Sequence, residues 1–136
     1  MKKIYLILAS FTVVSSLAFA VQKNPQIRTC NLLGGEFVVA STHQDQIGFC
    51  QFDKALIGAL DLTYFNNNES ISQSINNYMK GQNNCDQVGQ IETVIVIGGN
   101  SLQTCAFADG SYIELGTMIK GKESADNAKL NQVLGL

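Results

Sequence analysis

Residues 30–50, CNLLGGEFVVASTHQDQIGFC, begin and end with a cysteine, and residues 85–105, CDQVGQIETVIVIGGNSLQTC, do the same. These four cysteines are all that the chain of 136 residues contains. A shift of 55 positions superposes the two pairs and also four other positions: Gly34 on Gly89, Val39 on Val94, Phe52 on Phe107 and Leu60 on Leu115. The spacing therefore predicts two divergent copies of one module in tandem.

The equal spacing also predicts how the cysteines pair. Four cysteines allow three disulfide connectivities. If the module duplicated as a unit, its bond stays within each copy, which gives Cys30–Cys50 and Cys85–Cys105. Each bond then stabilises the fold by about 3 kcal/mol. The alternative, a zinc site, would need a CxxC motif or a nearby histidine pair, and neither copy has one.

The first 20 residues have the pattern of a secretory signal peptide. Lys2 and Lys3 precede an apolar run over 4–14, and Ala18-Phe19-Ala20 has the small-x-small form of a cleavage site. An uncleaved anchor is the alternative, but a run of about eleven residues is too short to span roughly 30 Å of hydrocarbon. We expect cleavage near Ala20, no transmembrane segment after cleavage, and a secreted or periplasmic protein whose disulfides form in an oxidising compartment.

The charge of the mature chain excludes one class of function. Removal of Lys2 and Lys3 reduces Lys and Arg from 9 to 7 against 11 Asp and Glu, so the net charge becomes about −4. The remaining basic residues are scattered along the sequence. The composition therefore predicts no nucleic-acid partner.

Each copy is predicted to form a helix, a β-hairpin and a second helix. In the first copy, Asn24-Pro25 caps and opens a helix that Gly34-Gly35 ends. Strands over 36–42 and 47–52 follow, and Asp53 is expected to cap a helix over 54–65, with Leu56, Leu60 and Tyr64 on one face.

The second copy repeats this order. Strands are expected over 91–97 and 102–107, and Ser111-x-x-Glu114 has the form of a capping box that opens a helix ending at Gly121. Between the copies, Ser70 is expected to cap a connecting helix that contains Ile71, Ile75, Tyr78 and Met79. The division is a signal peptide over 1–20, a first module over 21–66, a connector over 67–82, a second module over 83–121 and a tail over 122–136.

We therefore predict an α+β fold in which two helix–hairpin–helix modules form a small antiparallel sheet with helices packed on it, stabilised by disulfides. The run Val94-Ile95-Val96-Ile97 is apolar at every position, whereas a strand exposed on one face alternates. We expect this strand to be central or covered on both faces. The alternative is a dimer interface through Val94 and Val96.

Two fragments of the sequence resemble a known family. They are Asn24-Pro25-x-x-x-x-Cys30-x-x-x-Gly34-Gly35 and Cys105-x-Phe107-x-Asp109-Gly110-Ser111. Together they are similar to the two ends of a small exported bacterial domain, domain of unknown function 333, often labelled a hemolysin. The resemblance implies that each copy corresponds to one such domain. The chain departs from the family in having Ile113 and Gly116 where the family usually has a cysteine and a tryptophan. No pore is expected, because neither hairpin has the alternating strands of about ten residues of a membrane barrel.

The sequence contains no set of residues that specifies a reaction. His43 is the only histidine and lies in a predicted hairpin turn, while Asp53, Asp109 and Glu114 have structural roles as turn or cap residues. We expect neither an enzyme nor a cofactor or metal site. We expect an exported binding module whose partner is an unknown protein or envelope component, and the alternative is an inhibitor of a secreted hydrolase. The candidate binding loops contain His43, Gln44, Asp45, Gln46, Gly99 and Asn100.

Overall fold

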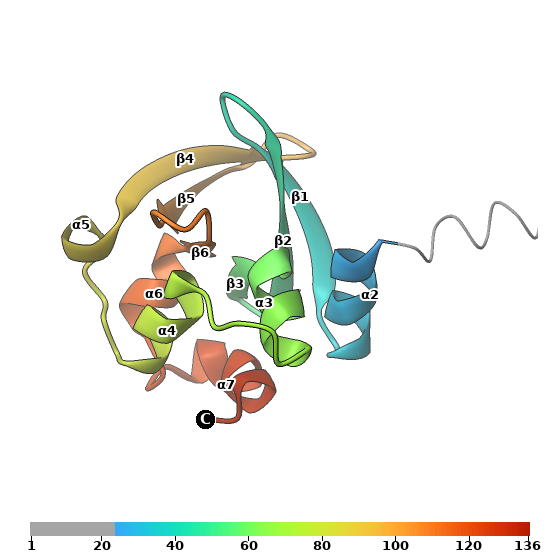
Figure 1. Ribbon diagram of the computed structural model, residues 1–136. Coiled ribbons are helices and arrows are strands. Elements are labelled where there is room, and N and C mark those ends of the chain that lie inside the picture. Colours follow the sequence, from blue (N-terminus) through green and yellow to red (C-terminus); the bar gives the residue numbers. More distant parts are fainter. Residues whose placement is uncertain (1–23) are drawn as a thin grey trace, which may run out of the picture.

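The computed structural model describes residues 24–136, so the predicted signal peptide lies outside the described residues. The first half of the chain contains α2 (Pro25–Leu32), β1 (Glu36–Ser41), β2 (Gln46–Phe52), β3 (Ala55–Gly58) and α3 (Ala59–Asn66). The second half contains α5 (Cys85–Val88), β4 (Gln90–Val96), β5 (Ser101–Ala106), β6 (Tyr112–Glu114) and α6 (Leu115–Lys120). Helix α4 (Gln73–Met79) connects the halves, and the short η1 (Ala125–Asn127) leads into α7 (Ala128–Leu134) (Figure 1).

The strands form a closed antiparallel barrel in the order β1-β2-β3-β6-β5-β4. Each half supplies three consecutive strands, and the barrel closes at two junctions between the halves. Strand β3 pairs with β6 at Ile57 and Ile113, and β1 pairs with β4 at Ala40–Val96 and Ser41–Ile95. The prediction of a small sheet with helices packed on it is therefore wrong.

The barrel could not be predicted from the sequence, because β3 and β6, which pair at one of its two junctions, are short. Ala55, Leu56 and Ile57 in β3 are all buried, so they show none of the alternation that identifies a strand with one exposed face. The helix expected over 54–65 begins only at Ala59. Asp53 lies in the turn between β2 and β3 with a φ of 55°, and it does not cap a helix. As a result Leu60 and Tyr64 are partly exposed and Leu56 belongs to a strand.

The expected capping box of the second half does not form either. Ser111 Oγ donates a hydrogen bond to Asp109 Oδ1, and β6 begins at the next residue. Glu114 itself caps α6, because its carboxylate accepts from the N–H groups of Gly116 and Thr117. Strand β6 thus occupies the residues that the sequence predicted to be the first helical turn.

Other local predictions are confirmed or corrected in detail. Asn24 Oδ1 accepts from Gln26 N and caps α2, with Pro25 at the first helical position. The connecting helix is capped by Ser72 instead of Ser70, which leaves Ile71 exposed. The run from Val94 to Ile97 is not covered on both faces, because Ile95 is 56% exposed while Val94 is fully buried.

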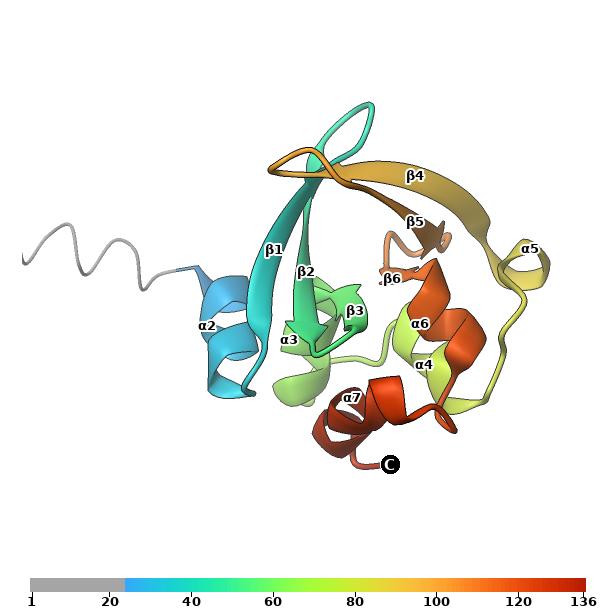
Figure 2. The ribbon, with the colours of Figure 1, turned by 180° about the vertical axis from the view of Figure 1, so that it is seen from behind.

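Both predicted disulfides are confirmed, and each lies within one half: Cys30–Cys50 and Cys85–Cys105. They belong to the larger of two cores, which lies between the outer face of the barrel and the helices. Figure 2 shows α2, α3 and α6 beside the strands, seen from behind. The smaller core lies inside the barrel and contains the buried residues Ala40, Phe49, Leu56 and Val94. The helices therefore pack against the outer face of the barrel, and both hairpin turns project from one end of it, at the top of Figure 1.

The halves correspond element by element, although duplication itself stays a prediction. Cys30 and Cys50 correspond to Cys85 and Cys105 at the expected shift of 55, but β1 corresponds to β4 at a shift of 54, and β3 to β6 at a shift of 56. The reason is that the segment between the first cysteine and the first strand is one residue shorter in the second half, whereas the turns between β4 and β5 and between β5 and β6 are each one residue longer. Gly89 thus corresponds to Gly35 and Val94 to Ala40.

The β3–β6 junction is held by side chains as well as by backbone pairing. Tyr112 N donates to Asp61 Oδ2 at 3.1 Å, and Leu56 N donates to Thr117 Oγ1 at 3.0 Å. Asp61 and Thr117 each occupy the third position of the helix that follows the closing strand, in α3 and α6 respectively. Each half therefore supplies a helix side chain that accepts a backbone N–H group of the other half.

Candidate binding site

An opening in the surface lies between the first hairpin turn and the beginning of β4. It has a volume of about 440 Å³ and is lined by the first hairpin turn and by β4. The turn contributes Thr42, His43 and Gln44, and the strand contributes Ile91, Glu92 and Thr93. The opening exists because β1 and β4 pair only at Ala40 and Ser41 and then diverge. We call it the cleft.

The cleft adjoins a smaller pocket of about 230 Å³ inside the second half of the barrel, and the two share Thr42 and Glu92. The remaining residues of the pocket come from β2, from β5 and from the segment leading into β6: Ile47, Thr104, Ala106, Phe107, Gly110, Ser111 and Tyr112. Tyr112 anchors its wall, because its hydroxyl donates to Gly48 O at 2.9 Å and its ring lies edge-on to that of Phe49.

The pocket lies in the second half because side chains at equivalent positions differ in size and polarity. In the first half, one row of residues across the sheet is Val38, Phe49 and Gly58. The equivalent row in the second half is Glu92, Thr104 and Glu114. Phe49 is fully buried and fills the barrel, whereas a threonine leaves space on the opposite side.

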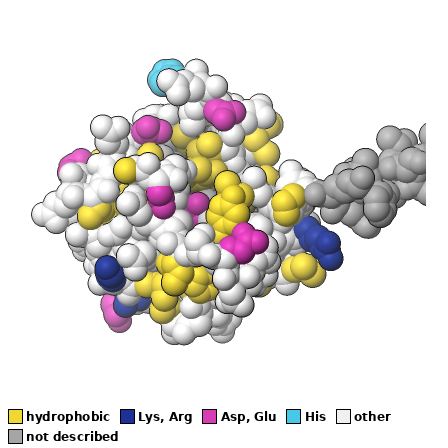
Figure 3. Space-filling model, in the orientation of Figure 1, with side chains coloured by type: hydrophobic (Ala, Val, Ile, Leu, Met, Phe, Trp, Pro, Cys, Tyr) yellow, Lys and Arg dark blue, Asp and Glu magenta, His cyan; other side chains and the backbone are white. Residues whose placement is uncertain are grey.

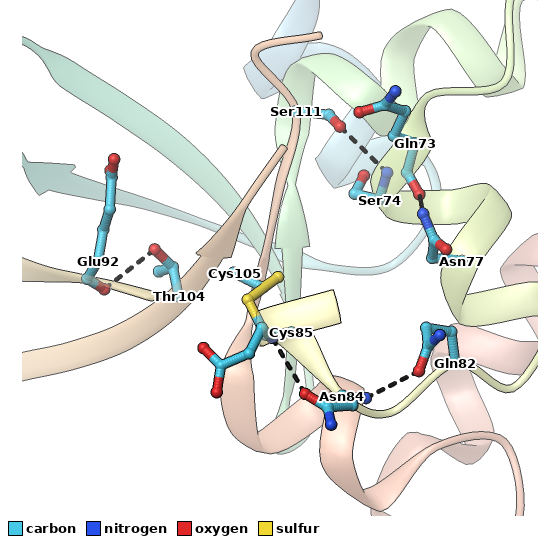
Figure 4. The surroundings of a disulfide bond; sticks show 11 residues. Gln73, Ser74, Asn77, Gln82, Asn84, Cys85, Glu92, Thr104, Cys105 and Ser111 are labelled. Atoms are coloured by element: carbon cyan, nitrogen blue, oxygen red, sulfur yellow. Dashed lines mark hydrogen bonds between the residues drawn. A yellow bond between two sulfur atoms is a disulfide. The ribbon is translucent and has the colours of Figure 1, made fainter. Parts of the chain in front are cut away.

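The polar side chains of that row are oriented by their own contacts. Thr104 Oγ1 donates to the backbone oxygen of Glu92 at 3.2 Å, as Figure 4 shows. The Glu114 carboxylate is held by its capping bonds to α6 and by the Thr117 hydroxyl at 2.6 Å. Glu92 is exposed, and its carboxylate is therefore available to a ligand in the cleft.

Lys and Arg are distributed unevenly between the barrel and the rest of the described chain. The sequence from 36 to 53 and from 81 to 119 contains no Lys or Arg, and these ranges hold the barrel strands except β3, together with both hairpin turns. They contain seven carboxylates: Glu36, Asp45, Asp53, Asp86, Glu92, Asp109 and Glu114. Among the basic residues outside these ranges, Lys54 and Lys120 contact Asp126 and Lys129 contacts Asp53. Figure 3 shows acidic side chains over the upper and middle parts of one face, and basic side chains at its lower left edge, with an acidic side chain beside them, and at its right edge.

The structure brings the sequence-predicted loops to the same end of the molecule (Figure 1). His43 and Gln44 line the cleft, Asp45 follows in the turn, and Gln46 begins β2. Thr42 Oγ1 orders this turn by accepting from Asp45 N at 2.9 Å. Gly99 and Asn100 lie in the other hairpin turn, where Asn100 O accepts from Val96 N, and they do not line the cleft. Sequence reasoning missed Ile91, Glu92 and Thr93, because they belong to a strand whose free edge only the tertiary structure defines.

A second cluster of polar residues is buried beneath α4. Asp61 Oδ2 accepts from Ser74 Oγ at 3.0 Å, and Ser111 Oγ accepts from Ser74 N at 3.0 Å (Figure 4 shows the latter bond). Burial raises the pKa of Asp61 to about 7. The hydrogen bonds that its carboxylate accepts from Tyr112 N and Ser74 Oγ favour the ionised form and limit this rise in pKa. Asp109 Oδ2 accepts from Gln73 N, so its pKa is lowered despite partial burial.

This cluster positions α4 against the second half and is largely buried, since Asp61 is 5% exposed and Ser74 and Ser111 are less exposed still. Of these three residues, Ser111 also borders the smaller pocket. The Asp-Gly-Ser turn therefore serves as an anchor for the connecting helix. The sequence offers one signal for the cluster, which is a carboxylate between Leu60 and Leu62 in an otherwise apolar segment.

Within residues 24–136, no three His, Cys, Asp or Glu side chains are placed to hold one metal ion, and no helix has the length and apolar character needed to cross a membrane. Comparisons with family models, with curated proteins and with solved structures give no match. The resemblance to domain of unknown function 333 therefore stays a prediction.

Proposed function

We propose that this protein is an exported binding module of the cell envelope or of the culture fluid, and that it recognises its partner through the cleft. Two disulfides are typical of small proteins that fold in an oxidising compartment. The observation that carries the proposal is the cleft itself, an open site that contains the exposed carboxylate of Glu92 and is lined by segments without Lys or Arg. Exposed polar and carboxylate groups around a concave site favour recognition of a positively charged partner.

The test is capture of partners on the immobilised mature protein, performed side by side with two charge-reversed variants. Glu92→Lys places a positive charge in the cleft, and Glu123→Lys makes the same change of net charge outside the cleft. We expect proteins from the native culture fluid or envelope extract to be retained by the wild type and by Glu123→Lys and to be lost from Glu92→Lys. Equal retention by all three proteins would exclude the cleft as the binding surface.

A second candidate is an inhibitor of a secreted hydrolase that presents the turn at His43 and Gln44. The order of this turn favours it, because Thr42 Oγ1 accepts from both Gln44 N and Asp45 N. The disulfide of the first half does not brace this turn, because Cys50 pairs with Phe37 at the other end of the hairpin. Inhibition of a panel of secreted proteases and lysozymes at micromolar concentration, lost in Gln44→Ala, would support this function.

A further inference from the structure

We propose that the cleft binds an extended segment of a partner protein, which adds as a β-strand to the free edge of β4 and carries alternating basic and apolar side chains. The inference rests on the proposed function, because it names the partner chemistry of the same cleft. Addition of a strand to an exposed sheet edge is a general mode of peptide recognition, in which main-chain hydrogen bonds supply affinity and alternate side chains supply specificity.

The backbone groups of alternate residues of β4 point toward β5 and toward the side on which β1 lies. Val96 N donates to Asn100 O and Val96 O accepts from Gly99 N, so the backbone groups of Val96 point toward β5. Ile97 N donates to Val39 O, so the backbone groups of the next residue point toward β1. Since this direction alternates along an antiparallel strand, those of Ile91 and Thr93 also point toward the β1 side.

Strand β1 does not reach that far along β4. Its last pairs are Ala40–Val96 and Ser41–Ile95, and β5 lies on the opposite side of β4. The N–H and C=O groups of Ile91 and Thr93 therefore have no backbone partner among the described residues and face the cleft, which both residues line. They form a row of donors and acceptors that an extended segment can pair with.

The corresponding edge in the first half is flanked differently. Helix α2 has eight residues and lies alongside β1, whereas α5 has four residues and lies beyond the end of β4 (Figure 1). Proteins normally protect an exposed apolar strand edge, because such an edge can pair with strands of other chains and cause aggregation. The edge of β4 instead carries one charged residue, Glu92, and it stays open.

The side chains next to this edge define the chemistry of the segment. On the outer face of β4, Ile91 and Ile95 are 44% and 56% exposed. Ile91 also borders a further opening that contains Leu115 and Ile119, which extends the apolar surface. On the inner face Glu92 projects at the mouth of the barrel. A strand beside β4 would therefore place apolar side chains beside the isoleucines and basic side chains beside Glu92.

A second copy of this chain is the less favourable occupant. Pairing of two β4 edges would bring the Glu92 carboxylates of the two copies close together, and residues 81–119, which contain β4, include no Lys or Arg to neutralise them. Like charges at close range oppose association. A basic partner segment has the complementary charge.

The experiment measures binding of a short fluorescein-labelled peptide of alternating valine and lysine to the mature protein by fluorescence anisotropy. Thr93→Pro removes the free N–H donor without removing a bond to β5, and proline is tolerated at such edge positions. Thr93→Val is the matched control, because it keeps the N–H group. We expect Thr93→Pro to bind at least about fivefold more weakly than Thr93→Val, and Glu92→Gln to weaken both binding and its dependence on salt.

Two outcomes would overturn the proposal. One is equal affinity of Thr93→Pro and Thr93→Val for the peptide, and the other is equal affinity of the wild type for this peptide and for one of alternating valine and glutamate. If Thr93→Pro does not fold, amide exchange in the wild type replaces it: the N–H groups of Ile91 and Thr93 should be protected when the peptide is added, and unchanged exchange contradicts strand addition. If strand addition were contradicted in this way but Glu92→Lys still failed to capture partners that the wild type captures, the proposed binding function would stand without strand addition.

Discussion

Gly35 shows how closely the backbone approaches the first disulfide. A Cβ atom at this position would overlap Cys50 Sγ and would lie 2.9 Å from the ring of Phe52 and 3.1 Å from Cys30 Sγ. The neighbouring Gly34 has open space around it and needs glycine for a different reason, its φ of 85°. Two adjacent glycines thus satisfy two separate constraints, one of packing and one of backbone conformation.

These constraints predict different costs. Gly35→Ala should lower the free energy of unfolding by about 3 kcal/mol, because a disulfide and a buried ring cannot move aside easily. Gly34→Ala should cost about 1–2 kcal/mol, the strain of alanine at positive φ. Urea unfolding of both variants measures the difference. An equal or smaller cost for Gly35→Ala would show that the disulfide region can shift.

Asp61 is a carboxylate that folding takes out of water. Burial raises its pKa to about 7, so the folded protein binds a proton more tightly at this group than the unfolded chain does. The resulting contribution to stability is present in full below the pKa of the unfolded chain, and it is lost as the pH rises toward 7.

The titration of Asp61 predicts that the stability of the wild type and that of Asp61→Asn depend differently on pH. Between pH 4 and pH 7, the free energy of unfolding of the wild type should fall relative to that of Asp61→Asn by about 3 kcal/mol. Asparagine keeps an oxygen that can accept from Tyr112 N and cannot ionise. Urea unfolding of both proteins at several pH values tests this, and parallel curves would show that Asp61 does not titrate in this range.

At the scale of elements, the reciprocal bonds at the β3–β6 junction explain how such short strands close a barrel. The ladder between β3 and β6 contains the pair Ile57–Ile113, and the N–H groups of Leu56 and Tyr112 beside it are accepted by helix side chains. A buried backbone donor without a partner is costly, so Thr117 and Asp61 make the junction stable where the ladder is too short to do so.

The junction therefore depends on the hydroxyl of Thr117. Thr117→Val keeps the shape of the side chain but removes the acceptor of Leu56 N, and should lower the free energy of unfolding by about 1–3 kcal/mol. Thr117→Ser, which keeps the hydroxyl, should cost less. Chemical denaturation gives the two costs, and faster exchange of the Leu56 amide in the valine variant alone locates the effect. A valine variant as stable as the serine variant would contradict this role.

Several features of these elements could be predicted from the residues. The cap at Asn24, both hairpins and both disulfides follow from local chemistry and from spacing, which do not depend on the remainder of the fold. Strands β3 and β6 could not be predicted, because a strand of three or four residues gives no reliable period. His43 and Gln44 could be identified as an exposed turn from the local polarity of the sequence. The edge at Ile91 and Thr93 could not, because its exposure depends on where the pairing of β1 with β4 ends in the folded protein.

On the scale of the whole molecule, each disulfide closes a loop with a sequence separation of 20 residues. Replacing both cysteines of either bond by alanine should therefore cost about 3 kcal/mol, and the two costs should be similar. Thermal and urea unfolding of the two double variants measures this. If one variant were as stable as the wild type, the corresponding disulfide would not stabilise the protein by restricting the conformations of the unfolded chain.

Because neither disulfide joins one half to the other, no covalent bond except the chain itself crosses the two barrel junctions. A single proteolytic cut in the turn at Asn66–Asn68 would convert the protein into two separate polypeptides, each with its own disulfide. Folding of the cut protein would then be an association reaction. Its midpoint of unfolding should rise with protein concentration, whereas that of the uncut chain stays constant.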